Sequence, residues 1–229
     1  MAAPGRLGIL FLTMEYAPET GNGIGSYHSV IAPALAARGH DVHVISCVPG
    51  QRRRDYVESG VMIHRRGQIH VPGLRRLPRG GGLRAGGARL RTVTSSALAM
   101  RELALDIDVV EAPDWMAEGL IVGARRRPPL VGHLHTPLVL TSRYGARPVA
   151  RWNAANLLER TAMRRAQVVT APSRLVLDLV REERWLEHAD ASYGCRSTQT
   201  VGAGSHRSLT LRRSCSRPAG SNRSRRRTS

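Results

Sequence analysis

Apolar and polar positions follow two alternating patterns along the first 183 residues of the chain. Continuous apolar runs of strand length cover residues 7–13, 41–47, 61–63, 108–111, 129–134 and 167–171. Between these runs, apolar residues recur every three or four positions, which predicts helices over residues 24–38, 90–105, 115–124, 149–165 and 173–181. Strands that are apolar on both faces and alternate with helices are typical of parallel sheets. We therefore predict an α/β fold, a Rossmann-like parallel sheet with helices on both faces.

Two segments interrupt this alternation. Residues 65–91 are rich in glycine, arginine and proline, and we predict a basic Gly/Arg loop there. After residue 183 the apolar periodicity stops, and from residue 191 onward the chain contains no acidic residue. Such a segment buries too little apolar surface to offset its ordering entropy. We expect one domain over residues 1–184 and a disordered Arg/Ser-rich tail over residues 185–229, which has the composition of a sequence read out of frame.

The formal net charge is +18, and all 35 basic residues are arginines. Residues 65–91 hold eight arginines and no acid, and residues 185–229 hold nine arginines and two acids. The excess therefore lies in these two segments and not on a periodic face, whereas nucleic-acid modules place basic residues on one helix face or among aromatics. A non-catalytic protein that binds anionic polymers or nucleic acid through its arginine-rich segments stays an alternative. Nonspecific polyanion binding is expected from the charge alone.

The cysteines and the lengths of the apolar runs indicate the cellular compartment of the protein. Three cysteines without a pattern favour neither a disulfide framework nor a zinc site, and Cys47 is interpreted as a small buried apolar residue. No apolar stretch approaches the roughly 20 residues that a membrane span needs. The run that begins at Leu7 is too short for a secretion signal. We expect a cytoplasmic protein, with a peripheral position at a membrane as the alternative, and no metal.

A glycine-rich loop, Gly-Asn-Gly-Ile-Gly over residues 21–25, joins the first predicted strand to the first predicted helix. Glycines allow close approach of a ligand to the backbone, and a helix N-terminus offers N–H groups to an anion. The dinucleotide fingerprint G-x-G-x-x-G fails, because Ser26 or His28 stands where the last glycine is needed. Two interpretations stay open at this point: a phosphate-binding turn and a flexible turn that begins a helix.

Polar side chains gather where two predicted strands end. His133 and His135 end the strand over residues 129–134, and Glu111 and Asp114 follow the preceding strand. Ligands of open parallel sheets bind at the carboxyl ends of the strands, so these residues are candidates for one crevice. The alternative is a set of solvated polar loop residues. No carboxylate or cysteine at ligand spacing completes a metal site with the two histidines.

Several segments together resemble the N-terminal domain of family 4 glycosyltransferases of the GT-B fold. The similarity extends from about residue 7 to residue 183, and Asn22 departs from it where the family often has glycine. The matching segments are Glu-Tyr-Ala-Pro at 15–18, Gly-Ile-Gly-Ser-Tyr at 23–27, Leu-Ala-Ala-Arg-Gly-His-Asp-Val at 35–42, Asp-Val-Val-Glu-Ala-Pro-Asp-Trp at 108–115, Leu-His-Thr-Pro at 134–137 and the stretch 159–173.

The resemblance implies a retaining, hexosyltransferase-like enzyme that moves a sugar from a nucleotide sugar to a sugar, lipid or small-molecule acceptor. The nucleotide sugar is a substrate, and no cofactor is implied. His135 would be the catalytic residue near the transferring sugar. The donor phosphates would contact Gly23, Ile24 and Gly25, and the acceptor-binding residues would be Glu111, Asp114 and Tyr27.

The family's nucleotide-binding C-terminal domain has no counterpart in this sequence. A second glycine loop and an Arg/Lys pair for the diphosphate are absent, since the chain contains no lysine. We therefore expect a truncated chain that carries the acceptor-side domain and is inactive alone.

Overall fold

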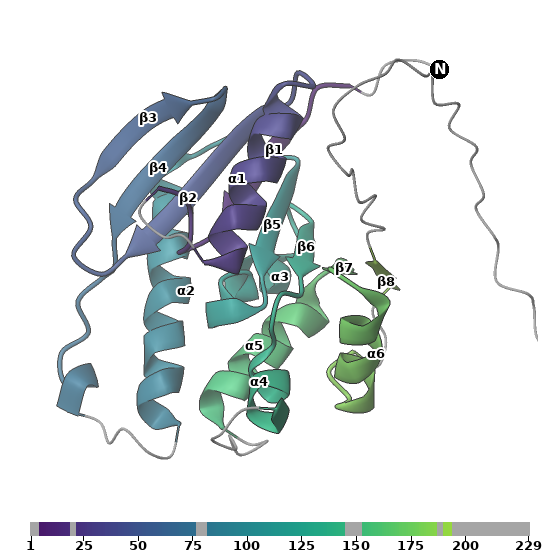
Figure 1. The fold of residues 1–229 in the computed structure, drawn as a ribbon. Helices are drawn as coiled ribbons and strands as arrows, with labels where there is room; N and C mark the ends of the chain where they lie inside the picture. The colour runs from purple at the N-terminus through teal and green to yellow at the C-terminus, as the bar shows by residue number, and fades with distance from the viewer. Residues whose placement is uncertain (1–4, 19–21, 77–81, 145–152, 187–189, 194–229) are drawn as a thin grey trace, which may run out of the picture. The chain divides into compact units, whose positions relative to one another are not determined.

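The computed structural model describes residues 5–18, 22–76, 82–144, 153–186 and 190–193 (Figure 1). In these residues eight strands form one sheet in the order β3-β4-β2-β1-β5-β6-β7-β8. All neighbouring strands are parallel except β3 and β4. The predicted α/β class is confirmed. The strands are β1 (Gly8–Leu12), β2 (Asp41–Val48), β3 (Arg54–Glu58), β4 (Val61–Gly67), β5 (Val109–Pro113), β6 (Leu130–His133), β7 (Val168–Ala171) and β8 (Asp190–Tyr193).

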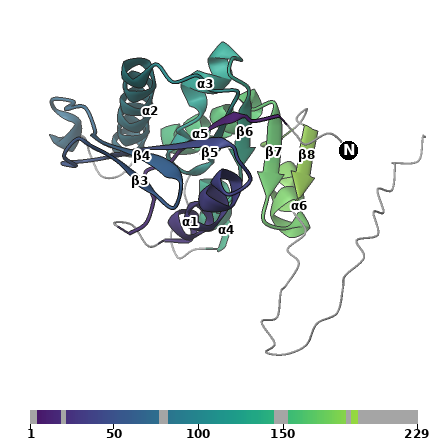
Figure 2. The same ribbon diagram turned by 90° about the horizontal axis from the view of Figure 1, so that it is seen from above.

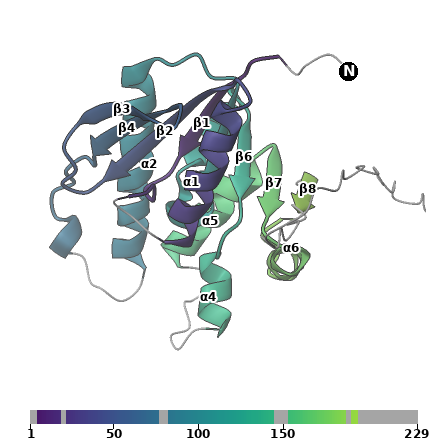
Figure 3. The ribbon, with the colours of Figure 1, turned by 45° about the horizontal axis from the view of Figure 1, so that its top comes forward.

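Helices cover both faces of the sheet, as predicted. In Figure 2, α2 and α3 lie on one side of the sheet, and α1 and α6 lie on the other. Figure 3 shows α4 at the end of the sheet to which β6 and β7 point. The helices are α1 (Gly23–Ala36), α2 (Leu83–Leu103), α3 (Leu120–Arg125), α4 (Leu138–Tyr144), α5 (Ala154–Arg165) and α6 (Arg174–Glu182), with short 3₁₀ turns η1 (Leu74–Arg76) and η2 (Trp115–Ala117).

The central strand β1 supplies side chains to two cores. Ile9 and Phe11 belong to the apolar cluster beneath α1. Leu10 and Leu12, which point to the opposite face, belong to the cluster formed with α2, α3 and α5. Because alternate residues of a strand face opposite sides, a strand in the middle of a two-sided sheet must be apolar throughout. This explains the unbroken apolar run from which β1 was predicted.

The predicted basic loop over residues 65–91 is wrong at both ends. Arg65 and Arg66 belong to β4, which continues to Gly67, and α2 begins at Leu83. Both arginines are buried, because their guanidinium groups have carbonyl, hydroxyl and carboxylate partners inside the protein. Sequence patterns treat arginine as a solvated residue, so the strand predicted over residues 61–63 stops short of Gly67 and the helix is predicted to begin too late.

Three elements were not predicted, namely β3, α4 and β8. Strand β3 forms a hairpin with β4 through Ser59 and Gly60, which have φ values of 50° and 79°. Two successive residues with positive φ are the requirement of a type I′ turn. Because β3 lies at the sheet edge and is largely exposed, it lacks the apolar alternation from which strands are recognised.

The fold continues past the predicted domain boundary at residue 184. The side chain of Trp185 is 1% exposed and packs in the larger core together with Leu186. Beyond them, β8 pairs in parallel with β7. These residues were placed in the tail because they stand among charged neighbours, although their own side chains are apolar. Disorder was predicted over residues 185–229, and it is wrong for 185–186 and 190–193, while residues 187–189 and 194–229 lie outside the described residues.

A buried ion pair joins α2 to α5. Arg89 Nε donates to Glu159 Oε1 at 2.8 Å, and the two side chains are 6% and 0% exposed. The same carboxylate accepts from the backbone N–H groups of Met116 and Leu138. The Arg89 guanidinium also lies 5.2 Å from the centre of the Trp115 ring. The pair therefore holds two helices and two loops at the carboxyl end of the sheet.

We predict that Arg89→Met lowers the free energy of unfolding by about 3–5 kcal/mol, because it leaves the Glu159 carboxylate buried without its cation. Urea unfolding at pH 7 measures the change. The matched control is Arg174→Met, which removes an exposed ion pair with Asp178 and should cost less than about 0.5 kcal/mol. A loss below about 1 kcal/mol in Arg89→Met would show that the pair does not carry this stability.

Candidate functional site

A cavity of about 410 Å³ lies at the carboxyl end of the parallel strands. It is bounded by the loops that follow β1, β5, β6 and β7 and by the first turn of α1. This is where open α/β sheets bind their ligands, because loops of neighbouring strands diverge there. The lining residues are Glu15, Asn22, Gly23, Ile24, Trp115, His135, Thr136, Thr141 and Pro172.

The first turn of α1 forms one wall of the cavity. Asn22 is the N-cap residue, but its side chain does not cap the helix. Instead its Nδ2 donates to Glu15 Oε1 at 3.1 Å. The other carboxylate oxygen of Glu15 is buried and makes no hydrogen bond with the described residues. A carboxylate thus contacts the N-cap residue of α1, and the N-terminus of a helix is a favourable place for negative charge.

His135 lies on the cavity wall, and its backbone N–H donates to Asp114 Oδ1 at 2.8 Å. Burial lowers the pKa of the imidazole to about 4, and the neighbouring His28 contributes in the same direction. The ring is therefore neutral near pH 7. Its Nε2 is buried and has no hydrogen-bond partner among the described residues. A neutral imidazole can donate or accept one further hydrogen bond there.

Tyr27 and Glu111 lie behind His135 and do not line the cavity. The Tyr27 ring stacks on His133 with 4.3 Å between ring centres, and its edge meets His135 at 5.3 Å. Burial raises the pKa of the Tyr27 hydroxyl, and the carboxylate of Glu111 raises it further. Glu111 Oε1 also lies 3.7 Å from Nε2 of the fully buried His28. These side chains form an aromatic and imidazole cluster that packs against His135.

The structure separates the predicted site residues into two groups. His135, Gly23 and Ile24 line the cavity, as a shared site requires. Gly25 is buried within α1, and Tyr27, Glu111 and Asp114 support the wall from behind. The roles given to them in catalysis, donor binding and acceptor binding stay predictions.

Sequence reasoning missed Glu118, which is buried beneath the loop that follows β1. Its Oε2 accepts from the Met14 N–H at 3.0 Å. Burial raises the pKa of Glu118 to about 8, and the nearby Glu15 raises it as well. In the same way, burial raises the pKa of Asp114 to about 7. The acidic residue within the otherwise apolar run Met-Ala-Glu-Gly-Leu at residues 116–120 was the one feature that could have revealed Glu118.

The backbone between Asp114 and Glu118 adopts an unusual conformation. Met116 and Ala117 have φ values of 62° and 57°, in the left-handed region that L-residues rarely occupy. The Met116 N–H donates to the Glu159 carboxylate, and the Ala117 N–H donates to the Asp114 carbonyl. Such strain persists only where surrounding contacts determine the conformation, and it is common at functional sites.

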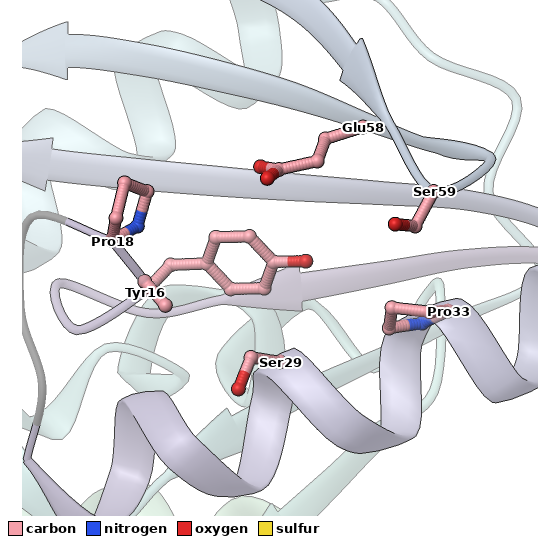
Figure 4. Close-up of a pocket in the computed structure, with 7 residues that line it drawn as sticks. Tyr16, Pro18, Ser29, Pro33, Glu58 and Ser59 are labelled. Atoms are coloured by element: carbon pink, nitrogen blue, oxygen red, sulfur yellow. The ribbon is translucent and has the colours of Figure 1, made fainter.

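A second, smaller cavity of about 140 Å³ lies on the other side of the loop that follows β1 (Figure 4). It is bounded by that loop, by α1 and by the β3–β4 turn. Figure 4 shows the Tyr16 ring across it, with the hydroxyl directed away from Pro18 towards the Ser59 and Pro33 end. Burial raises the pKa of Tyr16 to about 12, and the Glu58 carboxylate adds to the effect.

In the described part of the chain, no three histidine, cysteine, aspartate or glutamate side chains lie close enough to hold a metal ion. Over the same residues, no helix combines the length and the apolar character that crossing a bilayer requires.

Solved structures share this arrangement of sheet and helices. The sucrose-phosphate synthase of Thermosynechococcus elongatus is similar with a TM-score of 0.58 at 14% identity, over 81% of this chain and 47% of that chain. Apo UGT2 of Phytolacca americana is similar with a TM-score of 0.51 at 12% identity, over 85% of this chain and 53% of that chain. The catalytic domain of starch synthase IV from Arabidopsis thaliana, bound to ADP and acarbose, has a TM-score of 0.50 at 13% identity, over 72% of this chain and 45% of that chain. The chain thus spans about half the length of these structures.

These neighbours are glycosyltransferases of the GT-B fold, and the described sheet corresponds to the N-terminal domain of such enzymes. A family model described as Glycosyltransferase Family 4 matches residues 21–191, which is more than half of the sequence. The chain belongs to Glycosyltransferase Family 4, as the sequence motifs predicted. No curated protein matches the sequence.

We predict that Glu118→Gln makes stability less dependent on pH. With a folded pKa of about 8 against an ordinary value of 4.5, the native state binds more protons than the unfolded state between these values. The contribution of Glu118 is therefore full below pH 4.5 and is lost as the pH rises through 8. Urea unfolding from pH 5 to pH 8 should show a slope shallower by up to about 1.4 kcal/mol per pH unit, the limit for one proton.

The control for this prediction is Glu182→Gln, which changes an exposed glutamate. Its slope should match that of the unchanged protein. An equal slope in Glu118→Gln and the unchanged protein would contradict the raised pKa.

Proposed function

We propose that this chain is the acceptor-side domain of a retaining glycosyltransferase that takes a sugar from a nucleotide sugar. The observation that carries the proposal is the chemistry of the larger cavity. It combines a carboxylate, an amide, two hydroxyl groups, a neutral imidazole and an indole, from Glu15, Asn22, Thr136, Thr141, His135 and Trp115. Such groups suit the hydroxyls and the apolar face of a sugar.

The charge of the cavity favours an acceptor over a phosphate. Among the described residues no arginine lines it, and the Glu15 carboxylate lies beside the N-terminus of α1. A diphosphate at Gly23–Gly25 would gain the helix dipole but would face this carboxylate. We propose that donor binding needs cations outside the described residues, supplied by the second half of a GT-B cleft, and that this chain alone transfers no sugar.

His135 is the candidate catalytic residue in this proposal. With a pKa of about 4, its imidazole is neutral at pH 7 and makes a poor general acid. We propose that the ring instead holds a hydroxyl of the transferring sugar through one hydrogen bond. Asp114 fixes the backbone of His135, and the ring cluster behind it fixes the side chain. This arrangement orients the sugar before the reaction begins.

The alternative function, binding of anionic polymers through the arginine-rich segments, has less support. Arg65, Arg66 and Arg89, three of the eight arginines in residues 65–91, are buried and hydrogen-bonded. They do not form a basic surface. The arginines of residues 194–229 lie outside the described residues.

Saturation-transfer NMR with sucrose, maltose and trehalose tests the proposal. We expect transfer from the chain to at least one disaccharide at millimolar concentration, and weaker transfer to UDP and ADP because the cavity lacks a cation. His135→Ala should weaken disaccharide binding by about tenfold, the effect of one hydrogen bond in a buried site. Assays with UDP-glucose and ADP-glucose should show no turnover by this chain.

His43→Ala is the matched control, because His43 lies in β2 and does not line the cavity. It should leave sugar binding unchanged. Tight binding of UDP or ADP together with no binding of any disaccharide would contradict the acceptor-side assignment.

A further inference from the structure

Arg65 lies in β4, and its side chain is almost completely buried. Its Nη2 donates to two successive backbone carbonyls, Tyr16 O at 3.0 Å and Ala17 O at 2.9 Å. Its Nη1 donates to Ser46 Oγ at 3.1 Å, and the Tyr56 hydroxyl accepts from Nη2 at 3.3 Å. The guanidinium thus binds the loop that follows β1 through two of its backbone carbonyls.

The same loop is held at its other end. The Met14 carbonyl accepts from Ser46 Oγ at 3.1 Å, and the Met14 N–H donates to the buried Glu118. The Glu15 N–H donates to Thr13 Oγ1 at 3.1 Å. The backbone on both sides of Glu15 is therefore fixed by polar partners from β2, β4 and the segment after β5. Between Thr13 and Pro18, the described part of this loop, the side chain that lines the larger cavity is that of Glu15.

We propose that Arg65 is a positioning residue of the larger cavity, which holds the Glu15 carboxylate against Asn22 at the N-terminus of α1. The proposal rests on the proposed function only where it concerns sugar binding. The physical reason is that the Arg65 guanidinium and the loop after β1 each depend on the position of the other. A buried guanidinium is stable only while oxygens surround it, and two of these oxygens belong to the loop. A shift of the loop would leave the charge without these partners.

The Tyr16 side chain completes this arrangement. The Arg65 guanidinium lies 5.6 Å from the centre of the Tyr16 ring, and the ring is buried. Figure 4 shows this ring between the strands and α1, beside Ser29 and Pro33. The loop is thus held through its backbone by Arg65 and through its side chain by the packing of Tyr16. Lysine could replace the charge but not the planar set of donors that reaches several oxygens at once.

Amide hydrogen exchange measured by NMR tests the proposal on the unliganded chain. The reporters are the amides of Met14 and Glu15 in the loop and of Ser26, which donates to Asn22 O at 2.9 Å. In Arg65→Lys, we expect these amides to exchange about tenfold faster, the effect of losing a hydrogen bond to a charged group. Amides of β6 and β7 should keep their rates. Disaccharide binding should weaken by about fivefold.

The matched control is Arg66→Lys. Arg66 is the next residue of β4 and is also buried, but it donates to Asp55 and Glu102 and not to the loop. It should leave the exchange of Met14, Glu15 and Ser26 unchanged. A second variant, Arg65→Ala, leaves space for a soluble guanidinium ion, and millimolar methylguanidinium should restore slow exchange of the loop amides.

Three outcomes would overturn the proposal: unchanged loop exchange in Arg65→Lys, equal acceleration in Arg66→Lys, or faster exchange throughout the sheet in Arg65→Lys. If Arg65→Ala does not fold, the exchange rates of the loop amides in Arg65→Lys and Arg66→Lys decide the role of Arg65. If the unchanged chain binds no disaccharide, the proposed function fails, while the exchange rates still decide the role of Arg65.

Discussion

The buried carboxylates at the carboxyl end of the sheet constrain everything around the cavity. Asp114, Glu118 and Glu159 are almost entirely removed from water, so each needs hydrogen-bond donors from the protein. Each accepts a backbone N–H: those of His135 and Leu138 come from the connection between β6 and α4, and that of Met14 comes from the loop after β1. The loop after β1, the segment after β5 and the β6–α4 connection are therefore fixed relative to one another, because a buried polar group without a hydrogen-bond partner is costly.

The buried arginines likewise need partners inside the protein, in their case hydrogen-bond acceptors. Arg89 neutralises Glu159, and Arg65 binds the carbonyls of the loop after β1. A chain with a net charge of +18 thus uses part of its arginine content as internal structure. The loop conformations depend on these ions as much as on apolar packing. This also explains how Met116 and Ala117 keep a left-handed backbone between two buried acids.

The cavity that results has a definite chemical character. Among the described residues its wall carries the Glu15 carboxylate and no arginine, and the His135 imidazole is neutral near pH 7 because burial lowers its pKa to about 4. This suits a polyhydroxylated acceptor and is poorly suited to a diphosphate alone. This chemistry is the support for the proposal that the described domain holds the acceptor.

The sequence by itself determined the parallel α/β sheet, because β1 and its neighbours are apolar on both faces. It also determined the family, since the motifs at residues 15–27 and 108–115 occur in order. It also directed attention to His135, a polar residue at a strand end, which the structure places on the cavity wall and whose catalytic role stays a prediction. The burial of Arg65 and Glu118 was decided only by the tertiary structure. A charged residue becomes internal when distant loops bring it partners, and no local pattern records which loops will meet.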